Sequence, residues 1–351
     1  MPDVQLRRAA VANLFGGRPQ SDTHAGLWLS RGIACWPEDT AKKGKAFQQH
    51  IAQAAEIVPA PIYEAAYRRW RDLLAYVPQM IAWAGQLDGR MFIGLGGPSA
   101  IETAITISRT YGVPVIPGSA QKGLAHAYAR QVGIDMDDQY ILFGKTGPST
   151  DDFDSGYVIF HDAWWIPSSA PTPLAREVVT VHHAEYYKSC GATDSTDFDS
   201  PVTNAQIAAR GGFLFTVECT DPAWARLGMT LLSKSLKDLG IGGKIAAGYG
   251  RFESNKGENK RLDNERALAE QVRLPPEQRL RRTVETLSLG ELVLQLGKER
   301  NKTRQQHGEN WEAFLEFVVE IHGESIKSWE HSDKKNEKKA FKTVFGESTE
   351  R

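Results

Sequence analysis

The segment Ile116-Pro-Gly-Ser-Ala-Gln-Lys-Gly123 places a turn, a hydroxyl and a cation at the expected start of a helix. Gly118 and Ser119 stand directly before an apolar periodicity, so Ser119 is predicted to cap the helix. The N–H groups and the positive dipole end would then face outwards beside Lys122, which suits a phosphodiester. Gly123 would let a second backbone approach closely. An ordinary helix cap with a solvated lysine would produce the same pattern.

A second segment, residues 240–252, holds five glycines in eleven residues and interleaves them with two cations and a tyrosine. Its N–H groups and cations could hold phosphates without reading bases, and the tyrosine could stack on any base. It is not a P-loop, because Gly243-Lys244 is followed by Ile245, and it lacks the strand-to-helix context of a dinucleotide fingerprint. A flexible hairpin tip is the alternative interpretation. The candidate contacts are Gly242, Gly243, Lys244, Gly248, Tyr249, Gly250 and Arg251.

A third cluster contains two histidines and two tyrosines within residues 179–187: His182, His183, Tyr186 and Tyr187. The HEXXH spacing is absent and no cysteine lies at zinc-finger spacing, so packing or RNA contacts are expected rather than a metal site. The acidic run from Asp194 to Asp199 lacks the glycine and the terminal glutamate of an EF-hand loop. A solvated turn is its default interpretation.

Nucleophilic catalysis is not indicated by any local motif. The chain has no GxSxG elbow, and Cys35, Cys190 and Cys219 are widely spaced without a CxxC pair. We therefore predict no catalytic residue, metal or cofactor, and a reducing, cytoplasmic compartment.

The elements that must position these segments follow from periodicity. Residues 42–87 are predicted to be helical, and further helices are expected from Ser119 and over 221–239, the latter capped by Asp221 with Gly240 past its end. Strands are expected at 90–95, 101–107, 156–161, 212–218 and from Arg251-Phe252. The order strand, helix, strand, strand, helix, strand is that of a ferredoxin-like, split βαβ sheet of the α+β class.

The domain organisation is predicted from composition. Residues 1–89 form a partly helical N-terminal segment, and residues 90–254 form the core, with an insertion at about 167–209 that is long enough to project as a hairpin. Residues 255–351 hold 19 Lys+Arg and 18 Asp+Glu and few glycines. They are expected to form a charged helical extension.

The whole chain of 351 residues carries a formal charge of −1, which at first argues against a nucleic-acid partner. A whole-chain sum does not describe individual faces, however, and a handful of placed cations would suffice. Near-neutrality favours a protein that grips RNA weakly alone and relies on neighbouring subunits. No run of residues is long and apolar enough for a membrane span, so no membrane partner is expected.

The two glycine-containing segments together resemble the paired signatures of the RAMP superfamily, the RNA-recognition-motif-like proteins of CRISPR effector complexes. More specifically, the chain is similar to the capping backbone subunit, the sixth subunit, of type III-B (Cmr) complexes. Supporting matches run in family order from residue 90 to residue 254: 92–96, 142–144, 156–163, 183–187 and 199–202.

The resemblance implies a non-catalytic, RNA-binding structural subunit of a ribonucleoprotein for antiviral defence. Such a subunit holds the 3′ part of the guide RNA at the end of the backbone filament, helps align target RNA, and contacts other Cmr-type backbone and small subunits. The resemblance maps the guide-RNA surface onto Gly118, Ser119, Lys122, Gly123 and the loop around Lys244 to Arg251. The insertion would correspond to a thumb-like element, with His182, His183, Tyr186 and Tyr187 as candidate contacts.

Two rival functions stay open. One is a RAMP-superfamily endoribonuclease that processes CRISPR transcripts or cleaves target RNA. Its acid–base groups would be His182, His183 or Asp199. Asp194 and Asp197 lie in the same thumb-like insertion and are further candidates. The other is a protein–protein adaptor built on the charged extension.

Overall fold

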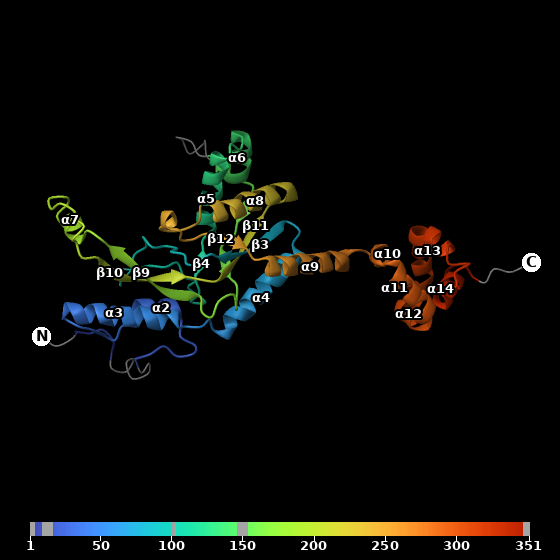
Figure 1. The fold of residues 1–351 in the computed structure, drawn as a ribbon, viewed down its shortest axis with the longest axis horizontal. Helices are drawn as coiled ribbons and strands as arrows, with labels where there is room; N and C mark the ends of the chain where they lie inside the picture. Colours follow the sequence, from blue (N-terminus) through green and yellow to red (C-terminus); the bar gives the residue numbers. More distant parts are fainter. Residues whose placement is uncertain (1–3, 9–16, 100, 102, 146–153, 347–351) are drawn as a thin grey trace, which may run out of the picture. The chain divides into compact units, whose positions relative to one another are not determined.

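The computed structural model describes residues 4–8, 17–99, 101, 103–145 and 154–346, and the chain divides into two compact units, residues 1–266 and 267–351 (Figure 1). The N-terminal unit contains a sheet, its covering helices and a separate hairpin. The C-terminal unit is helical. The change of composition after residue 254 falls just before helix α9 (Lys256–Arg273), which continues across the boundary between the units.

The core of the N-terminal unit is a six-stranded antiparallel sheet in the order β12-β3-β11-β8-β4, with β7 also paired to β11. Central strand β11 pairs with β3 from Gly212 opposite Gln86 to Glu218 opposite Met80. The predicted strand at 212–218 is therefore confirmed. The strands are β3 (Met80–Leu87), β4 (Val115–Ile116), β7 (Ile159–Phe160), β8 (Ala163–Trp165), β11 (Gly212–Glu218) and β12 (Phe252–Ser254).

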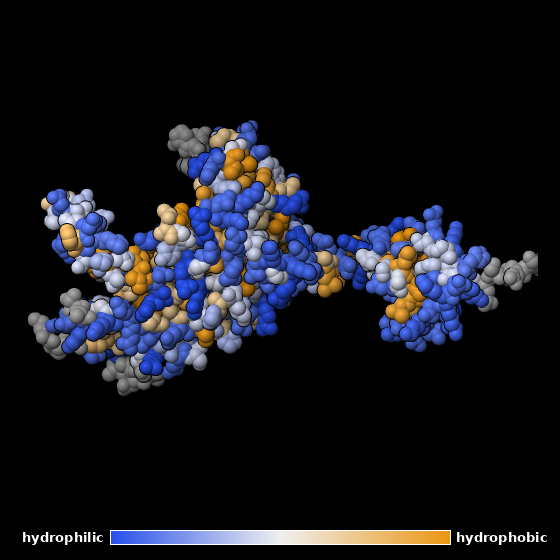
Figure 2. Space-filling model, viewed as in Figure 1, coloured by the Kyte–Doolittle hydropathy of each residue, from blue (hydrophilic) through white to orange (hydrophobic). Residues whose placement is uncertain are grey.

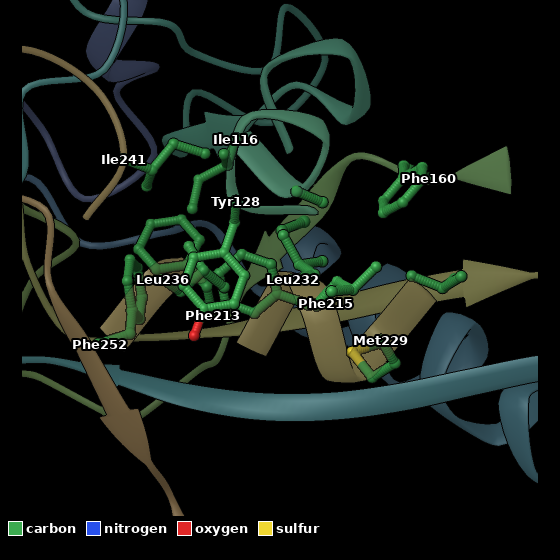
Figure 3. Close-up of a cluster of buried hydrophobic side chains, with 14 of the residues drawn as sticks. Ile116, Tyr128, Phe160, Phe213, Phe215, Met229, Leu232, Leu236, Ile241 and Phe252 are labelled. Atoms are coloured by element: carbon green, nitrogen blue, oxygen red, sulfur yellow. The ribbon is translucent and has the colours of Figure 1, made fainter. Parts of the chain in front are cut away.

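Helices cover both faces of this sheet, because β11 is apolar on both sides. Phe213, Phe215 and Val217 face α5 (Gly118–Gln131) and α8 (Pro222–Asp238), while Leu214 faces α4 (Pro61–Tyr76). Figure 3 shows the first cluster, in which Leu232 and Leu236 of α8 meet Phe213, Phe215 and Phe252 of the sheet. The predicted helix at 221–239 is confirmed with its Asp221 cap, which accepts from the Ala223 amide.

A separate hairpin lies between β8 and β11 in the chain. Strands β9 (Leu174–Val181) and β10 (Val202–Ala209) pair antiparallel over their whole length, and the short helix α7 (Ala184–Lys188) lies at the tip (Figure 1). Its base packs on helices α2 (Ala25–Arg31) and α3 (Thr40–Ala55), since Leu174 and Ile207 share a buried cluster with them. Exposed hydrophobic residues also occur on the hairpin (Figure 2).

The helical interpretation of residues 80–87 was wrong. These residues form β3, a central strand of the sheet, because Pro78 interrupts the preceding helix and seven consecutive pairings with β11 override the helix propensity of the alanines. In the earlier part of the region 42–87, the helical prediction is confirmed over α3 and α4.

The predicted strands at 90–95 and 101–107 were also wrong; Glu102 of the second lies outside the described residues. The structure has only isolated bridges here, Met91 with Ala209, Phe92 with Gly243, and Ile107 with Pro114. Gly94 has a φ of +78° and turns the chain shortly after the first two bridges, which prevents a continuous strand over 90–95.

Smaller elements complete the N-terminal unit. Helix α6 (Met136–Phe143) leads into strand β5 (Gly144–Lys145), which pairs with β6 (Asp154–Ser155). Strands β1 (Val4–Gln5) and β2 (Cys35–Trp36) pair with each other. No helix among the described residues has the length and apolar character needed to cross a membrane.

The C-terminal unit is helical and packs around a buried cluster of its own. Its core contains Val284, Leu292, Leu296, Phe314 and Val318. Its elements are α10 (Pro276–Thr286), α11 (Leu289–Val293), the π-helical segment η3 (Leu294–Lys298), α12 (Arg300–His307), α13 (Trp311–Lys327) and α14 (Lys335–Phe345).

Candidate nucleic-acid interface

The start of α5 differs from the predicted cap. Pro117 occupies the N-cap position without a side-chain hydrogen bond, Ser119 lies inside the first turn, and the Gly118 amide donates to Asp162 Oδ1 at 2.8 Å. The prediction that Ser119 caps the helix was therefore wrong, and a carboxylate from the segment between β7 and β8 occupies this position. A Cβ on Gly118 would lie 1.9 Å from the Phe160 carbonyl oxygen, so the glycine is required for packing.

Lys122 and Gly123 follow on the first turns of the same helix. Lys122 is half-buried, whereas Gly123 is exposed, and a Cβ on Gly123 would meet nothing within 4 Å. Among the described residues, no backbone approaches Gly123 closely. A glycine inside a helix costs about 1 kcal/mol relative to alanine, and no contact within the described structure requires glycine at this position.

The glycine loop, residues 240–252, is more ordered than a flexible tip. Gly242 has a φ of +96° and its Cβ would lie 2.2 Å from the Phe92 carbonyl oxygen, while Lys244 adopts a left-handed conformation with a φ of 57°. The amides of Gly243 and Gly250 donate to the carbonyls of Phe92 and Arg90. These two N–H groups are not presented outwards, contrary to what the glycine content suggested for the loop as a whole.

The side chains of the loop divide between two roles. Lys244 is exposed at its apex. Arg251 donates to the carbonyls of Lys237 and Asp238, and so caps the C-terminal end of α8. The ring of Tyr249 packs on Phe92 with centroids 4.7 Å apart. The structure thus leaves Lys244 outside such contacts; RNA binding by Arg251 and Tyr249 stays a prediction.

The junction segment, Arg90–Ile93, connects the glycine loop to the two other candidate elements. Met91 exchanges backbone hydrogen bonds with Ala209 at the base of the hairpin, while Phe92 accepts from the loop. Ile93 accepts from Thr106, whose carbonyl accepts from Val115, directly before the turn into α5. The glycine loop, the base of the hairpin and the approach to α5 therefore meet around one segment, whereas the histidine and tyrosine cluster of residues 179–187 lies at the opposite end of the hairpin. Figure 3 shows Ile116 and Ile241, one from each glycine segment, in the same core cluster.

Arg90 is a candidate that the sequence motifs did not single out. Its Nε is buried and has no hydrogen-bond partner among the described residues. Burial lowers the pKa of Arg210, at the end of the hairpin, and the Arg90 guanidinium lowers that pKa further, which indicates two neighbouring cations. Like charges placed together are unfavourable without an anion between them or nearby. The only sequence signal was the position of Arg90 after Asp88-Gly89.

The hairpin tip places His183 beside Asp199. His183 Nδ1 and Asp199 Oδ2 are 2.9 Å apart, and Asp199 also accepts from the Thr196 amide. These hydrogen bonds hold the pKa of the Asp199 carboxyl below its usual value, with the contact to His183 the largest cause. His182, which directly precedes His183 in the chain, is exposed.

The aromatic candidates of the tip are solvent-facing. Tyr186 and Tyr187 form an edge-on pair with ring centroids 5.5 Å apart, and Phe198 is 97% exposed. No group of three His, Cys, Asp or Glu side chains within the described ranges is arranged to hold a metal ion.

A pocket of about 330 Å³ lies beside the start of α5. It is lined by the rings of Tyr63, Tyr111 and Trp164 together with Arg109 and Asp162. Trp164 stacks between Tyr63 and Trp70 at interplanar angles of 16° and 14°, and Trp165 is buried, so this tryptophan pair anchors the core.

The sequence model of the RAMP superfamily matches residues 86–253, from the end of β3 into β12. This part of the chain is a RAMP superfamily domain. The RAMP domain thus includes α5, the glycine loop, the hairpin and the junction segment, and it implies a ferredoxin-like core for the antiparallel sheet. The order β12-β3-β11 followed by β7 and β8 agrees with that fold.

The chain is also similar to a curated protein and to solved structures. It is 23% identical to the CRISPR system Cmr subunit Cmr6 of Pyrococcus furiosus, over 56% of this chain and 74% of that protein. The crystal structure of Cmr6 from Pyrococcus furiosus superimposes with a TM-score of 0.33 at 24% identity, over 50% of this chain and 97% of that one. A chain in the cryo-EM structure of the type III-B Cmr-beta complex bound to cognate target RNA gives 0.49 at 16% identity, over 63% and 76%.

Proposed function

We propose that this RAMP protein is a non-catalytic, RNA-binding structural subunit of a type III-B CRISPR (Cmr) effector complex. In this role it holds the 3′ part of the guide RNA at the end of the backbone filament and helps align target RNA for antiviral defence. Its similarity to Cmr6 over three quarters of that protein supports the assignment to the complex. Neighbouring Cmr-type backbone and small subunits are its expected protein partners.

The observation that carries the RNA-binding proposal is the convergence on the junction segment. The glycine loop, the hairpin base and the approach to α5 are all hydrogen-bonded to or through Arg90–Ile93. The segment carries Arg90, which neighbours Arg210 and has an unpartnered Nε, and its backbone is bonded to the loop that carries the exposed Lys244. Cations presented without a set of directional base contacts bind the RNA backbone and do not read its sequence.

The proposal is tested by measuring guide-RNA affinity of the full-length protein as a function of salt concentration. Lys122→Ala, Lys244→Ala and Arg90→Ala should each weaken binding to unrelated RNA sequences about equally. Each should also reduce the slope of log affinity against log salt by about 0.7, the value for one lost phosphate contact on a single strand. Lys45→Ala, which removes an exposed lysine from α3, is the matched control.

A salt-independent affinity, or an equal loss in the Lys45 control, would contradict the phosphate-binding proposal. Reconstitution with the other subunits is the second readout. There the Lys244 variant should reduce incorporation of guide RNA without preventing subunit assembly.

The rival endoribonuclease function has one observation in its favour, the contact between His183 and Asp199. A carboxylate that orients an imidazole is a common arrangement for acid–base catalysis. Purified protein incubated with repeat RNA or target RNA, with and without a chelator, separates the two functions. Cleavage that is lost in His183→Ala and retained in Lys45→Ala would establish the nuclease, whereas intact RNA in every sample supports the structural role.

A further inference from the structure

The C-terminal unit contains a basic pocket that the proposed function does not use. It has a volume of about 840 Å³ and lies where the end of η3 and the start of α12 face the C-terminal half of α14. Its charged lining residues are Lys298, Glu299, Arg300, Lys302, Lys339 and Lys342.

Tight backbone packing holds the two walls of this pocket together. A Cβ on Gly297 would lie 2.4 Å from the Asn336 carbonyl oxygen, so η3 and α14 approach more closely than any other residue would allow. The Thr343 hydroxyl, 9% exposed, donates to the Leu296 carbonyl at 2.9 Å. Leu296 and Ala340 are fully buried behind the pocket. The lysines of both walls therefore extend from a fixed backbone.

The charge of the pocket is strongly one-sided. Among the lining residues that the structure describes, there are five cations and one carboxylate, Glu299, whose Oε2 is 3.8 Å from Lys302 Nζ. The complete extension is nearly neutral, with 19 basic and 18 acidic residues. The described lining is therefore more basic than the extension as a whole, and the positive end of α12 adds to the field of these cations.

The chemistry of the lining distinguishes an RNA backbone from an acidic protein partner. Among the described lining residues there is no aromatic or large apolar side chain. Protein interfaces gain most of their affinity from such anchors, whereas backbone recognition in nucleic acids uses Lys, Arg, Asn, Thr and main-chain groups. The space-filling view agrees, since hydrophilic residues cover most of the visible face of this unit (Figure 2).

We propose that this pocket binds the phosphodiester backbone of single-stranded RNA without reading its bases. It would be a second RNA contact, formed by residues other than Lys122, Lys244 and Arg90. The inference goes beyond the proposed function, because it assigns RNA binding to a unit outside the RAMP domain.

The test compares two double variants of one helix in the full-length protein. Lys339→Glu/Lys342→Glu reverses two charges inside the pocket, and Lys335→Glu/Lys338→Glu reverses two exposed charges of α14 outside it. Both change the net charge equally. The probe is a mixed-sequence single-stranded RNA, and thermal melting verifies that each variant is folded.

The pocket variant should weaken RNA binding about tenfold at low salt and reduce the salt slope by about 1.4, as expected for two lost phosphate contacts. The control variant should bind within about twofold of the unchanged protein, the range expected when no specific contact is lost. An oligonucleotide with uncharged methylphosphonate linkages should not distinguish the two variants. The Lys122 and Lys244 variants should retain the contribution of the pocket.

Three outcomes would overturn the inference. One is an equal loss in both double variants, which would indicate net charge alone. Another is no loss in the pocket variant. The third is that polyglutamate binds the unchanged protein at least as tightly as RNA does, and displaces RNA from it but not from the pocket variant. That result would indicate an acidic protein ligand. In each case, salt-dependent losses in the Lys122 and Lys244 variants would still support the proposed function.

Discussion

At the residue scale, positions 242 and 248 of the glycine loop require glycine for different reasons. Both have a φ above +90°, which costs an L-residue about 1–2 kcal/mol. Only Gly242 also faces a backbone atom, because its Cβ would lie 2.2 Å from the Phe92 carbonyl oxygen, whereas Gly248 has open space around it. Comparing the two separates the cost of the conformation from the cost of the contact.

We expect Gly248→Ala to destabilise the protein by about 1–2 kcal/mol and Gly242→Ala by clearly more, because the latter must also displace the junction segment. Denaturant unfolding of the full chain measures both. Hydrogen exchange should show increased exchange of the Gly243 and Met91 amides in the Gly242 variant alone. Equal destabilisation by the two substitutions would mean that the contact with Phe92 contributes nothing.

At the element scale, the sequence predicts those elements whose type and ends are indicated by their own residues. Helix α8 has Asp221 at its cap and Pro222 in the first position, and β11 is a continuous apolar run, so both were recognised. Strand β3 was missed because Met-Ile-Ala-Trp-Ala has no alternation, and its identity depends on β11, more than 120 positions later in the chain.

The candidate site was predictable in its composition but not in its connections. The sequence indicated Lys122 and Lys244 as cations, whereas Asp162 at the start of α5 and Arg251 at the end of α8 depend on contacts between distant segments. No sequence motif indicates Arg90, for the same reason. Its unpartnered Nε results from burial against the hairpin and the loop, which no spacing of residues reveals.

Helix α5 offers a test in which stability and binding change in opposite directions. Gly123→Ala should stabilise the helix by up to about 1 kcal/mol, since the position is exposed and its Cβ would meet nothing. If RNA lies against this turn, the same methyl group should weaken RNA binding severalfold. Thermal unfolding and RNA titration of one sample measure both effects. A stabilised variant with unchanged affinity for RNA would show that RNA does not contact this turn of α5.

At the scale of the whole molecule, the chain consists of two units with separate hydrophobic cores. The C-terminal core, which includes Trp311, Phe314 and Ile326, is built entirely from residues of that unit. The rival adaptor function would rest on this unit alone, so its independence matters for interpreting any truncation.

We expect a fragment of residues 274–351 to fold by itself. Circular dichroism should show a helical spectrum and a cooperative thermal transition, because the buried side chains of the cluster need no contribution from residues before α10. Trp311→Ala, which removes a buried ring, is the control and should abolish the transition or lower its midpoint strongly. A spectrum without helix would show that the fragment needs the preceding residues.

Because β9 and β10 pair without interruption, the number of cross-strand pairs sets both the length of the hairpin and the face on which the side chains of its tip stand. Each cross-strand pair adds about 3.4 Å of reach and reverses the face on which the next side chain stands. Removing one pair, such as Val181 with Val202, would shorten the arm and also turn the tip histidines and tyrosines over. Removing two pairs would shorten it further but restore their direction. Length and orientation can therefore be changed separately, and natural variants of this arm should differ by even numbers of pairs.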